Sequence, residues 1–346
     1  MGFLGAVVVE DGVSFQGEIT NSGLISAPQN GLYIGNAEHQ LEITNIRSGR
    51  IESGSRAVNL DGDNVSLSNS GTILGTGDQR NGTVYVDGTG DNISIENTSR
   101  ALIDAGEGNS GSGVSVQVGA AGGLSDGSDD LETSVDIVNN GDIRGRGFDN
   151  VPAGVRLFVG SGLTASTFTG NINNQRSGLI ASDQEAGILI EEGINFNGQI
   201  TNEGTIRGGN GLAINAAGAT GSVNVTNTAE ASLEGDVVLG EGNDTFLNQN
   251  SDNLNIAGGG GDDLLTGSSG VSTFAFDLGS GKATITDFQV SQDVLDLGAF
   301  FSDATQVLGA TSQVGSDALI SLSVDDSITL ANVDAASLTT DNFNFA

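Results

Sequence analysis

The chain has 346 residues, and 44 acidic residues against 11 basic ones give it a formal net charge of −33. A surface of this charge repels nucleic acid and anionic lipid, and it concentrates divalent cations, so nucleic acid is excluded as a partner. The absence of cysteine excludes disulfides and thiolate metal sites, and no apolar run reaches the ~18 residues that a membrane-spanning helix needs.

A repeated phrase organises the first two thirds of the chain. Each copy has an apolar residue, a polar residue, an asparagine, a short turn and a second apolar residue, as in ITNSGLI (19–25) and ITNEGTI (200–206). Short strands with apolar-polar alternation, such as GTVYVDG and GLAINAAG, lie between the copies. The asparagines are Asn21, Asn45, Asn69, Asn97, Asn139, Asn174, Asn202 and Asn227.

An all-β repeat of only ~25 residues cannot bury its apolar face alone and must stack on its neighbours. We therefore predict an all-β fold in which residues 1–235 form a right-handed parallel β-helix of about eight ~25-residue repeats. The asparagines then line up along one edge. They are interpreted as a ladder of stacked amides that hydrogen-bond one another and the turn backbone, with a ligand-binding row as the alternative.

A nine-residue period replaces this repeat in the next segment. GGGGDDLLT (258–266) matches the nonapeptide G-G-x-G-x-D-x-U-x, where U is a large apolar residue, at every fixed position. LGEGNDTFL (239–247) lacks only the opening glycine, and GSSGVSTFA (267–275) carries serine in place of the aspartate. LNQNSDNLN (247–255) is a degenerate copy that keeps Asp252.

This stretch resembles the calcium-binding repeats of RTX proteins, which implies a parallel β-roll over residues 236–275. Glycines with positive φ would direct carbonyls outward, and aspartates of adjacent turns would complete an all-oxygen site for Ca²⁺. An ordinary array of acidic β-turns is the alternative. The expected metal-site residues are Gly240, Gly242, Asp244, Asp252, Gly258, Gly259, Gly261, Asp262 and Asp263.

Similar aspartates precede other strands. GDNVSL, GDNISI and SDNLNI place Asp63, Asp91 and Asp252 at the same point of the pattern. A cation could lie between such carboxylates, but acceptance of turn N–H groups is the preferred interpretation.

The last segment, residues 276–346, has longer apolar strands and is predicted to cap the solenoid. ITDFQVSQDVLDLGAF (285–300) is similar to the segment that follows the repeats in many RTX proteins, and a hairpin is expected at Asp325–Asp326. The acidic, lysine-poor tail is similar to the uncleaved C-terminal signals of type I secretion substrates. The resemblance covers residues 236–346.

The sequence offers few groups for catalysis. Besides arginine, the candidates are His39, Tyr33, Tyr85 and Lys282. His39 is expected at the surface, and both tyrosines are expected at the surface or half-buried. No carboxylate-plus-base constellation is evident, so no catalytic residue is predicted.

The function expected is that of a secreted, calcium-binding structural or adhesive β-solenoid of a Gram-negative bacterium. Its expected partners are calcium ions, further copies of itself in a head-to-tail fibre, and a cell-surface or matrix polysaccharide. A polysaccharide-active β-helix enzyme, either a lyase or an epimerase, is the alternative.

Overall fold

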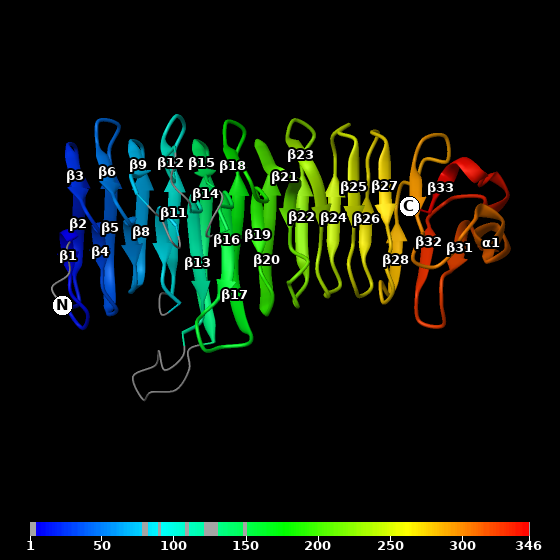
Figure 1. Ribbon diagram of the computed structural model, residues 1–346, viewed down its shortest axis with the longest axis horizontal. Coiled ribbons are helices and arrows are strands. Elements are labelled where there is room, and N and C mark those ends of the chain that lie inside the picture. The colour runs from blue at the N-terminus through cyan, green and yellow to red at the C-terminus, as the bar shows by residue number, and fades with distance from the viewer. Residues whose placement is uncertain are drawn as a thin grey trace.

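The computed structural model describes residues 5–77, 82–88, 91–107, 111–120, 131–147 and 151–345. Figure 1 shows an elongated stack of strands that runs from the N-terminal end to a small cap near the C-terminus. Apart from two antiparallel strand pairs in that cap, the paired strands are parallel. The parallel β-solenoid predicted from the repeats is therefore confirmed.

In its N-terminal part the solenoid has three strands per repeat, each belonging to one of three parallel stacks. The first stack contains β1 Gly5–Val9, β4 Asn30–Ile34, β7 Arg56–Leu60, β10 Val84–Val86, β13 Val114–Val118, β16 Val155–Val159 and β19 Ile188–Ile190. The second contains β2 Gln16–Asn21, β5 Glu38–Asn45, β8 Asp63–Asn69, β11 Ile93–Asn97, β14 Glu132–Asn139, β17 Ser166–Asn174 and β20 Ile194–Asn202. The third contains β3 Leu24–Ala27, β6 Arg50–Ser53, β9 Thr72–Gly75, β12 Leu102–Asp104, β15 Asp142–Gly145 and β18 Leu179–Ser182.

The stack narrows to two strands per repeat at β21 (Thr205–Asn215), which pairs with both β18 and β19. A register shift between Arg207 and Leu212 accompanies this merger. The number of strands per repeat therefore changes at residues 205–215, ahead of residue 236, where the nine-residue period begins in the sequence. The two-stranded repeats contain β22 Val223–Asn227, β23 Ser232–Val238, β24 Thr245–Asn248, β25 Leu254–Ala257, β26 Leu264–Thr266, β27 Ser272–Ala275, β28 Lys282–Ile285 and β29 Val294–Asp296.

A C-terminal cap covers the last repeat. The predicted hairpin is present, and Leu322 N donates to Asp326 O across its turn at 3.0 Å. A short helix, which the sequence prediction did not include, begins after Asp303, whose carboxylate accepts Gln306 N. The cap contains α1 Ala304–Gly309, β30 Thr311–Val314, β31 Asp317–Ser321, β32 Ser327–Leu330, η1 Ala335–Ser337, η2 Thr340–Asn342 and β33 Phe343–Asn344.

Columns of aliphatic and aromatic side chains fill the interior. Strand alternation places one buried residue of each repeat above the equivalent residue of the next, so each column is continuous. The Phe168 and Phe196 rings stack with their centroids 5.4 Å apart. One column contains Ile43, Leu67, Ile95, Ile137, Ile172, Ile200, Val225, Phe246, Leu265 and Ile285, each no more than 1% exposed.

A ladder of asparagine amides runs beside this core. Each Nδ2 donates to Oδ1 of the next asparagine at 2.7–2.9 Å, and Asn248 Nδ2 closes the series on the Gly267 carbonyl at 3.1 Å. The predicted ladder is therefore confirmed for the eight asparagines named above. Asn248 is a ninth member that the repeat pattern did not reveal, because its copy of the phrase is degenerate.

The N-terminal end of the stack lacks an equivalent cover among the described residues. Strands β1, β2 and β3 each pair with only one neighbouring strand there. The core side chains of this first repeat, including Val7, Phe15 and Ile19, are only partly buried. Within the described residues, the first repeat therefore presents an open edge of backbone groups and apolar side chains.

Candidate functional site

The two aspartates at the centre of the predicted metal site lie one above the other on consecutive repeats. Pairing of Thr245 with Leu264 puts Asp244 and Asp263 at equivalent positions. Asp244 N donates to Asp263 Oδ1 at 3.0 Å, and Leu264 N donates to Asp244 O at 2.9 Å. The structure therefore brings together the pair expected from the 19-residue spacing.

Both carboxylates are directed into the turns. Asp244 is 1% exposed and accepts Val223 N at 2.7 Å and Gly240 N at 2.9 Å, while Asp263 is 3% exposed. Burial raises the pKa of Asp244 to about 6 and that of Asp263 to about 7, although the backbone N–H donors oppose the shift. In this structure the aspartates act as caps for buried turn amides.

The glycines of this segment allow the turns to stack closely. Gly259 and Gly261 have φ values of 86° and 102°, in the left-handed region that favours glycine. A Cβ on Gly259 would lie 1.9 Å from the Gly240 carbonyl oxygen, and one on Gly261 would lie 2.3 Å from that of Gly242. Gly258, like Gly240 and Gly242, lies outside the left-handed region, so positive φ was correctly expected for only part of the set.

The expectation that glycine carbonyls are directed outward is wrong at Gly240 and Gly261. The Gly240 carbonyl accepts Gly260 N at 2.8 Å, and the Gly261 carbonyl accepts Lys282 N at 3.1 Å. These bonds run along the stack and join consecutive turns, because the backbone groups of a parallel solenoid pair with the next repeat.

The carboxylates of Asp252 and Asp262 are not part of this buried pair. Leu254 pairs with Ser272, so Leu254, and not Asp252, occupies the aspartate position of the degenerate nonapeptide. The Asp252 carboxylate accepts Leu233 N at 3.0 Å and Asn250 Nδ2 at 2.6 Å. Asp262 is exposed.

Asp63 and Asp91 also accept backbone N–H groups, as the preferred interpretation expected. Asp63 Oδ1 accepts Asp91 N at 2.9 Å, and Asp91 Oδ1 accepts Ser134 N at 3.1 Å. Like Asp252, they satisfy donors of neighbouring repeats.

Asp293 is a further aspartate whose carboxylate accepts backbone N–H groups of the turns, and it was not among the residues expected from the sequence. Its Oδ1 accepts Ser272 N at 2.9 Å and its Oδ2 accepts Gln289 N at 2.8 Å, so it repeats the arrangement at Asp244. Burial raises its pKa. The signal that could have found it is the D-x-L spacing that Asp293 and Leu295 share with Asp263 and Leu265.

The oxygen donors of the aspartate pair are of the type that Ca²⁺ takes, but most are already used. Both oxygens of Asp244 and one of Asp263 accept backbone N–H groups, so a cation at this point would compete with those bonds. Within the described ranges, no three His, Cys, Asp or Glu side chains gather as a metal-binding group. Any cation in this segment would therefore need backbone carbonyl or hydroxyl ligands as well.

Tyr33 and Tyr85 are more deeply buried than expected, at 5% and 1% exposure. Tyr33 Oη lies 2.6 Å from Asp11 Oδ1 and 3.0 Å from Asp61 Oδ2. A phenol has one hydrogen to donate, so the second carboxyl group can hydrogen-bond to the same oxygen only by donating a proton of its own. Burial, and after it the charge of Asp87, raises the pKa of Asp61 to about 7.

His39 is buried as well, at 2% exposure, so its expected surface position is wrong. Phe15 N donates to Nδ1 at 3.1 Å, so Nε2 carries the hydrogen that it donates to the Gly35 carbonyl at 2.9 Å. The ring joins neighbouring repeats, a role that local sequence around His39 does not reveal.

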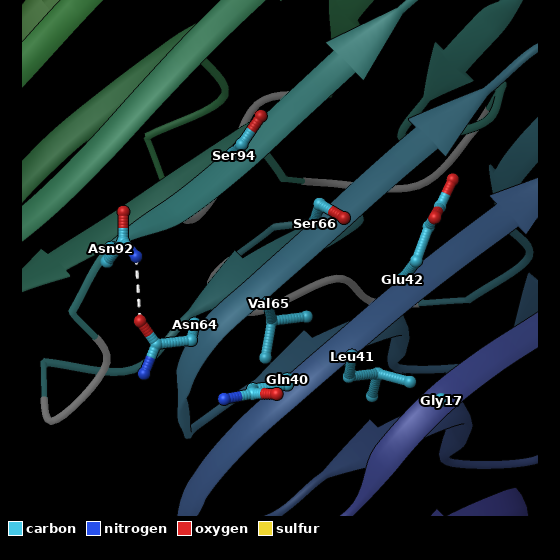
Figure 2. Close-up of a pocket in the computed structure, with 9 residues that line it drawn as sticks. All are labelled: Gly17, Gln40, Leu41, Glu42, Asn64, Val65, Ser66, Asn92 and Ser94. Carbon is cyan, nitrogen blue, oxygen red and sulfur yellow. Dashed lines mark hydrogen bonds between the residues drawn. The ribbon is translucent and has the colours of Figure 1, made fainter.

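A shallow hollow of about 460 Å³ lies over the second strand stack near the N-terminal end. Figure 2 shows its side chains, among which Asn92 Nδ2 donates to Asn64 Oδ1 at 2.7 Å. Glu42 is the one titratable side chain in its lining, beside amides and hydroxyls such as Gln40 and Ser66. This surface offers neutral hydrogen-bonding groups to a ligand.

No protein-family model and no curated protein sequence matches this chain. In the part of the chain that the structure describes, no helix is both long enough and apolar enough to cross a membrane.

Proposed function

We propose that the chain is a secreted, calcium-stabilised structural or adhesive β-solenoid of a Gram-negative bacterial surface or matrix. The observation that carries this proposal is the uninterrupted parallel stack, with one core and one amide ladder through nine repeats. Such a rod transmits load along its axis because each repeat is hydrogen-bonded to the next. Secretion and calcium binding are supported by the resemblance to RTX proteins in residues 236–346.

The open N-terminal edge supports a head-to-tail fibre of these rods. The ladder has a direction, since Asn21 Nδ2 donates towards Asn45 and its Oδ1 accepts Gly23 N. If two copies met at this same edge, the acceptor oxygen of one Asn21 amide would face the acceptor oxygen of the other. Neither could donate to its partner, which disfavours a symmetric head-to-head contact. At the other end, β30 is the last strand of its sheet and has an outer edge for a second copy. The hollow in Figure 2, which is lined by amides, hydroxyls and the single carboxylate of Glu42, is the surface where a polysaccharide would bind.

Assembly should depend on protein concentration and on calcium. The charge of −33 opposes contact between copies, so screening by millimolar Ca²⁺ is expected to allow polymers whose axial repeat is near one subunit length. Light scattering and electron microscopy measure this result. Particles that stay monomeric at high concentration in Ca²⁺ would contradict the fibre proposal.

Removal of calcium should loosen residues 236–275 before the N-terminal repeats. Turns that carry many carboxylates repel one another without a cation, whereas the asparagine ladder carries no charge. Thermal melting followed by circular dichroism, in EDTA and in millimolar Ca²⁺, measures the effect, and millimolar Mg²⁺ is the control for screening alone. Identical melting curves in EDTA and Ca²⁺ would be evidence against a calcium-stabilised segment.

A further inference from the structure

The first repeat is joined to the second at the corner between β1 and β2, at the blue end of the stack in Figure 1. Residues 10–14, which form this corner, are all exposed. Gly12 N donates to Asn36 O at 2.8 Å, and Asn36 N donates to Asp11 Oδ1 at 3.2 Å. Asp11 Oδ1 also lies 2.6 Å from Tyr33 Oη. The Asp11 carboxylate therefore takes part in two of the contacts that hold this exposed corner.

Tyr33 continues the Asp11 contact into the next repeats. Strand pairing puts Gly35, Asp61 and Asp87 at equivalent positions of three consecutive repeats. Gly35 has no side chain, and the Tyr33 hydroxyl lies between the carboxyl groups of the repeats on either side, 3.0 Å from Asp61 Oδ2. The Asp61 and Asp87 side chains are hydrogen-bonded to each other. Asp11, Tyr33, Asp61 and Asp87 therefore form one row of oxygens, to which four repeats each contribute one group.

The row depends on a carboxyl hydrogen. Tyr33 can donate to only one of its two carboxyl neighbours, so its contact with the other needs a hydrogen from Asp61 or Asp11. Burial raises the pKa of Asp61 to about 7, and the charge of Asp87 adds to this shift while Arg56 opposes it. Above that pH two ionised carboxylates compete for one phenol hydrogen. Water can replace Tyr33 at the exposed Asp11 more easily than at the half-buried Asp61, so the phenol should turn to Asp61.

We infer that this row is a pH switch for the docking of the first repeat. At mildly acidic pH a carboxyl hydrogen of Asp61 lets Tyr33 hold Asp11, and at alkaline pH the corner 10–14 is released from the second repeat. The edge of the first repeat is the surface proposed above for head-to-tail contact, so alkaline pH should also weaken assembly. That consequence rests on the proposed function, whereas the switch within a single chain does not.

Hydrogen exchange of the full chain at pH 6 and pH 8, followed by mass spectrometry, tests the switch. The amides of Gly12 and Asn36 report docking, because both donate hydrogen bonds between the corner and the second repeat. After correction for the intrinsic exchange rate at each pH, their protection is expected to fall by up to about tenfold at pH 8. The amides of β17 and β20, in the middle of the stack, should keep their protection.

Three variants separate the row from the acidity of the whole surface. Asp61→Asn should abolish the fall, because its amide can donate to Tyr33 Oη at both pH values. Tyr33→Phe, which loses only the hydroxyl, should leave the corner poorly protected at both. Asp325→Asn, which removes one exposed carboxylate from the cap, is the matched control and should behave as the wild type does. Circular dichroism shows whether each variant is folded.

His39 joins the same two repeats, since Phe15 N donates to its Nδ1. A second hydrogen on this ring would displace Phe15 N and loosen the first repeat at the lower pH, which is the opposite direction. Unchanged protection in the wild type would overturn the switch. So would a fall that persists in Asp61→Asn or that extends equally to β17 and β20.

Light scattering at the same two pH values tests the consequence for assembly. Polymers that are lost at pH 8 in the wild type but retained in Asp61→Asn would support control of assembly by the row. Polymers that persist at pH 8 although the corner is released would overturn that control. A chain that forms no polymers at either pH would contradict the fibre proposal, while hydrogen exchange alone decides on the switch.

Discussion

Replacement of Asn69 by alanine is expected to destabilise the solenoid by about 3 kcal/mol. Asn69 Oδ1 accepts Asn45 Nδ2 at 2.7 Å and Gly71 N at 3.2 Å, and its Nδ2 donates to Asn97 Oδ1 at 2.8 Å. All of these groups lie in a region from which water is excluded, so the substitution leaves several of them without a full set of partners. Urea unfolding followed by circular dichroism measures the loss.

The matched control for this substitution is Asn36→Ala. Asn36 is exposed and lies outside the ladder, so its replacement should change the free energy of unfolding by less than about 0.5 kcal/mol. Equal losses at the two positions would show that the ladder contributes no more than an ordinary surface amide.

Stability in calcium-free buffer is expected to fall as the pH rises from 5 to 8. The pKa of Asp61 is raised to about 7 in the folded chain, above the ~3.9 of an unfolded aspartate. A carboxyl group shifted in this direction contributes stability that is fully present below about pH 4 and lost as the pH rises through about 7. The expected loss is on the order of 2 kcal/mol from this group, measured as a lower melting temperature at pH 8.

Asp61→Asn separates this group from the general repulsion of the acidic surface. An amide can donate to Tyr33 Oη at every pH, so the variant should be more stable than the wild type at pH 8 and should have a shallower pH dependence. The groups that face Asp61 are Tyr33, Asp11, Asp87 and Arg56, and the substitution leaves all four in place. If the stability of Asp61→Asn falls with pH as steeply as that of the wild type, the pH dependence arises from other carboxylates.

The fold was predictable because its information is local and repeated. Asn69 and Asn97 occupy the same place in their phrases. In a parallel stack, equivalent residues of successive repeats lie next to each other, so the phrases predicted the ladder. Asn248 was missed because the residues around it in the sequence differ from the repeated phrase, although its backbone occupies the equivalent position in the stack. Strand register, visible only in the structure, places it below Asn227.

The candidate site was predictable only in part. The nonapeptide identified Asp244 and Asp263 as equivalent positions, which their stacking in the structure bears out. It also suggested Asp252 for the same row, and the register places Leu254 there instead. Degenerate copies can be aligned by sequence in more than one register, whereas strand pairing selects one.

The sequence by itself determined the all-β class, the stacking of repeats, the change of period and the asparagine ladder, since each follows from residues that recur at fixed spacing. Only the tertiary structure decided the direction of the carboxylates and the burial of His39 and Tyr33. Two-residue alternation says which side chains share a face, but it does not say whether a neighbouring turn covers that face. A carboxylate can accept a hydrogen bond from an N–H group or coordinate a cation. The position of the adjacent repeat decides whether a backbone N–H group reaches it.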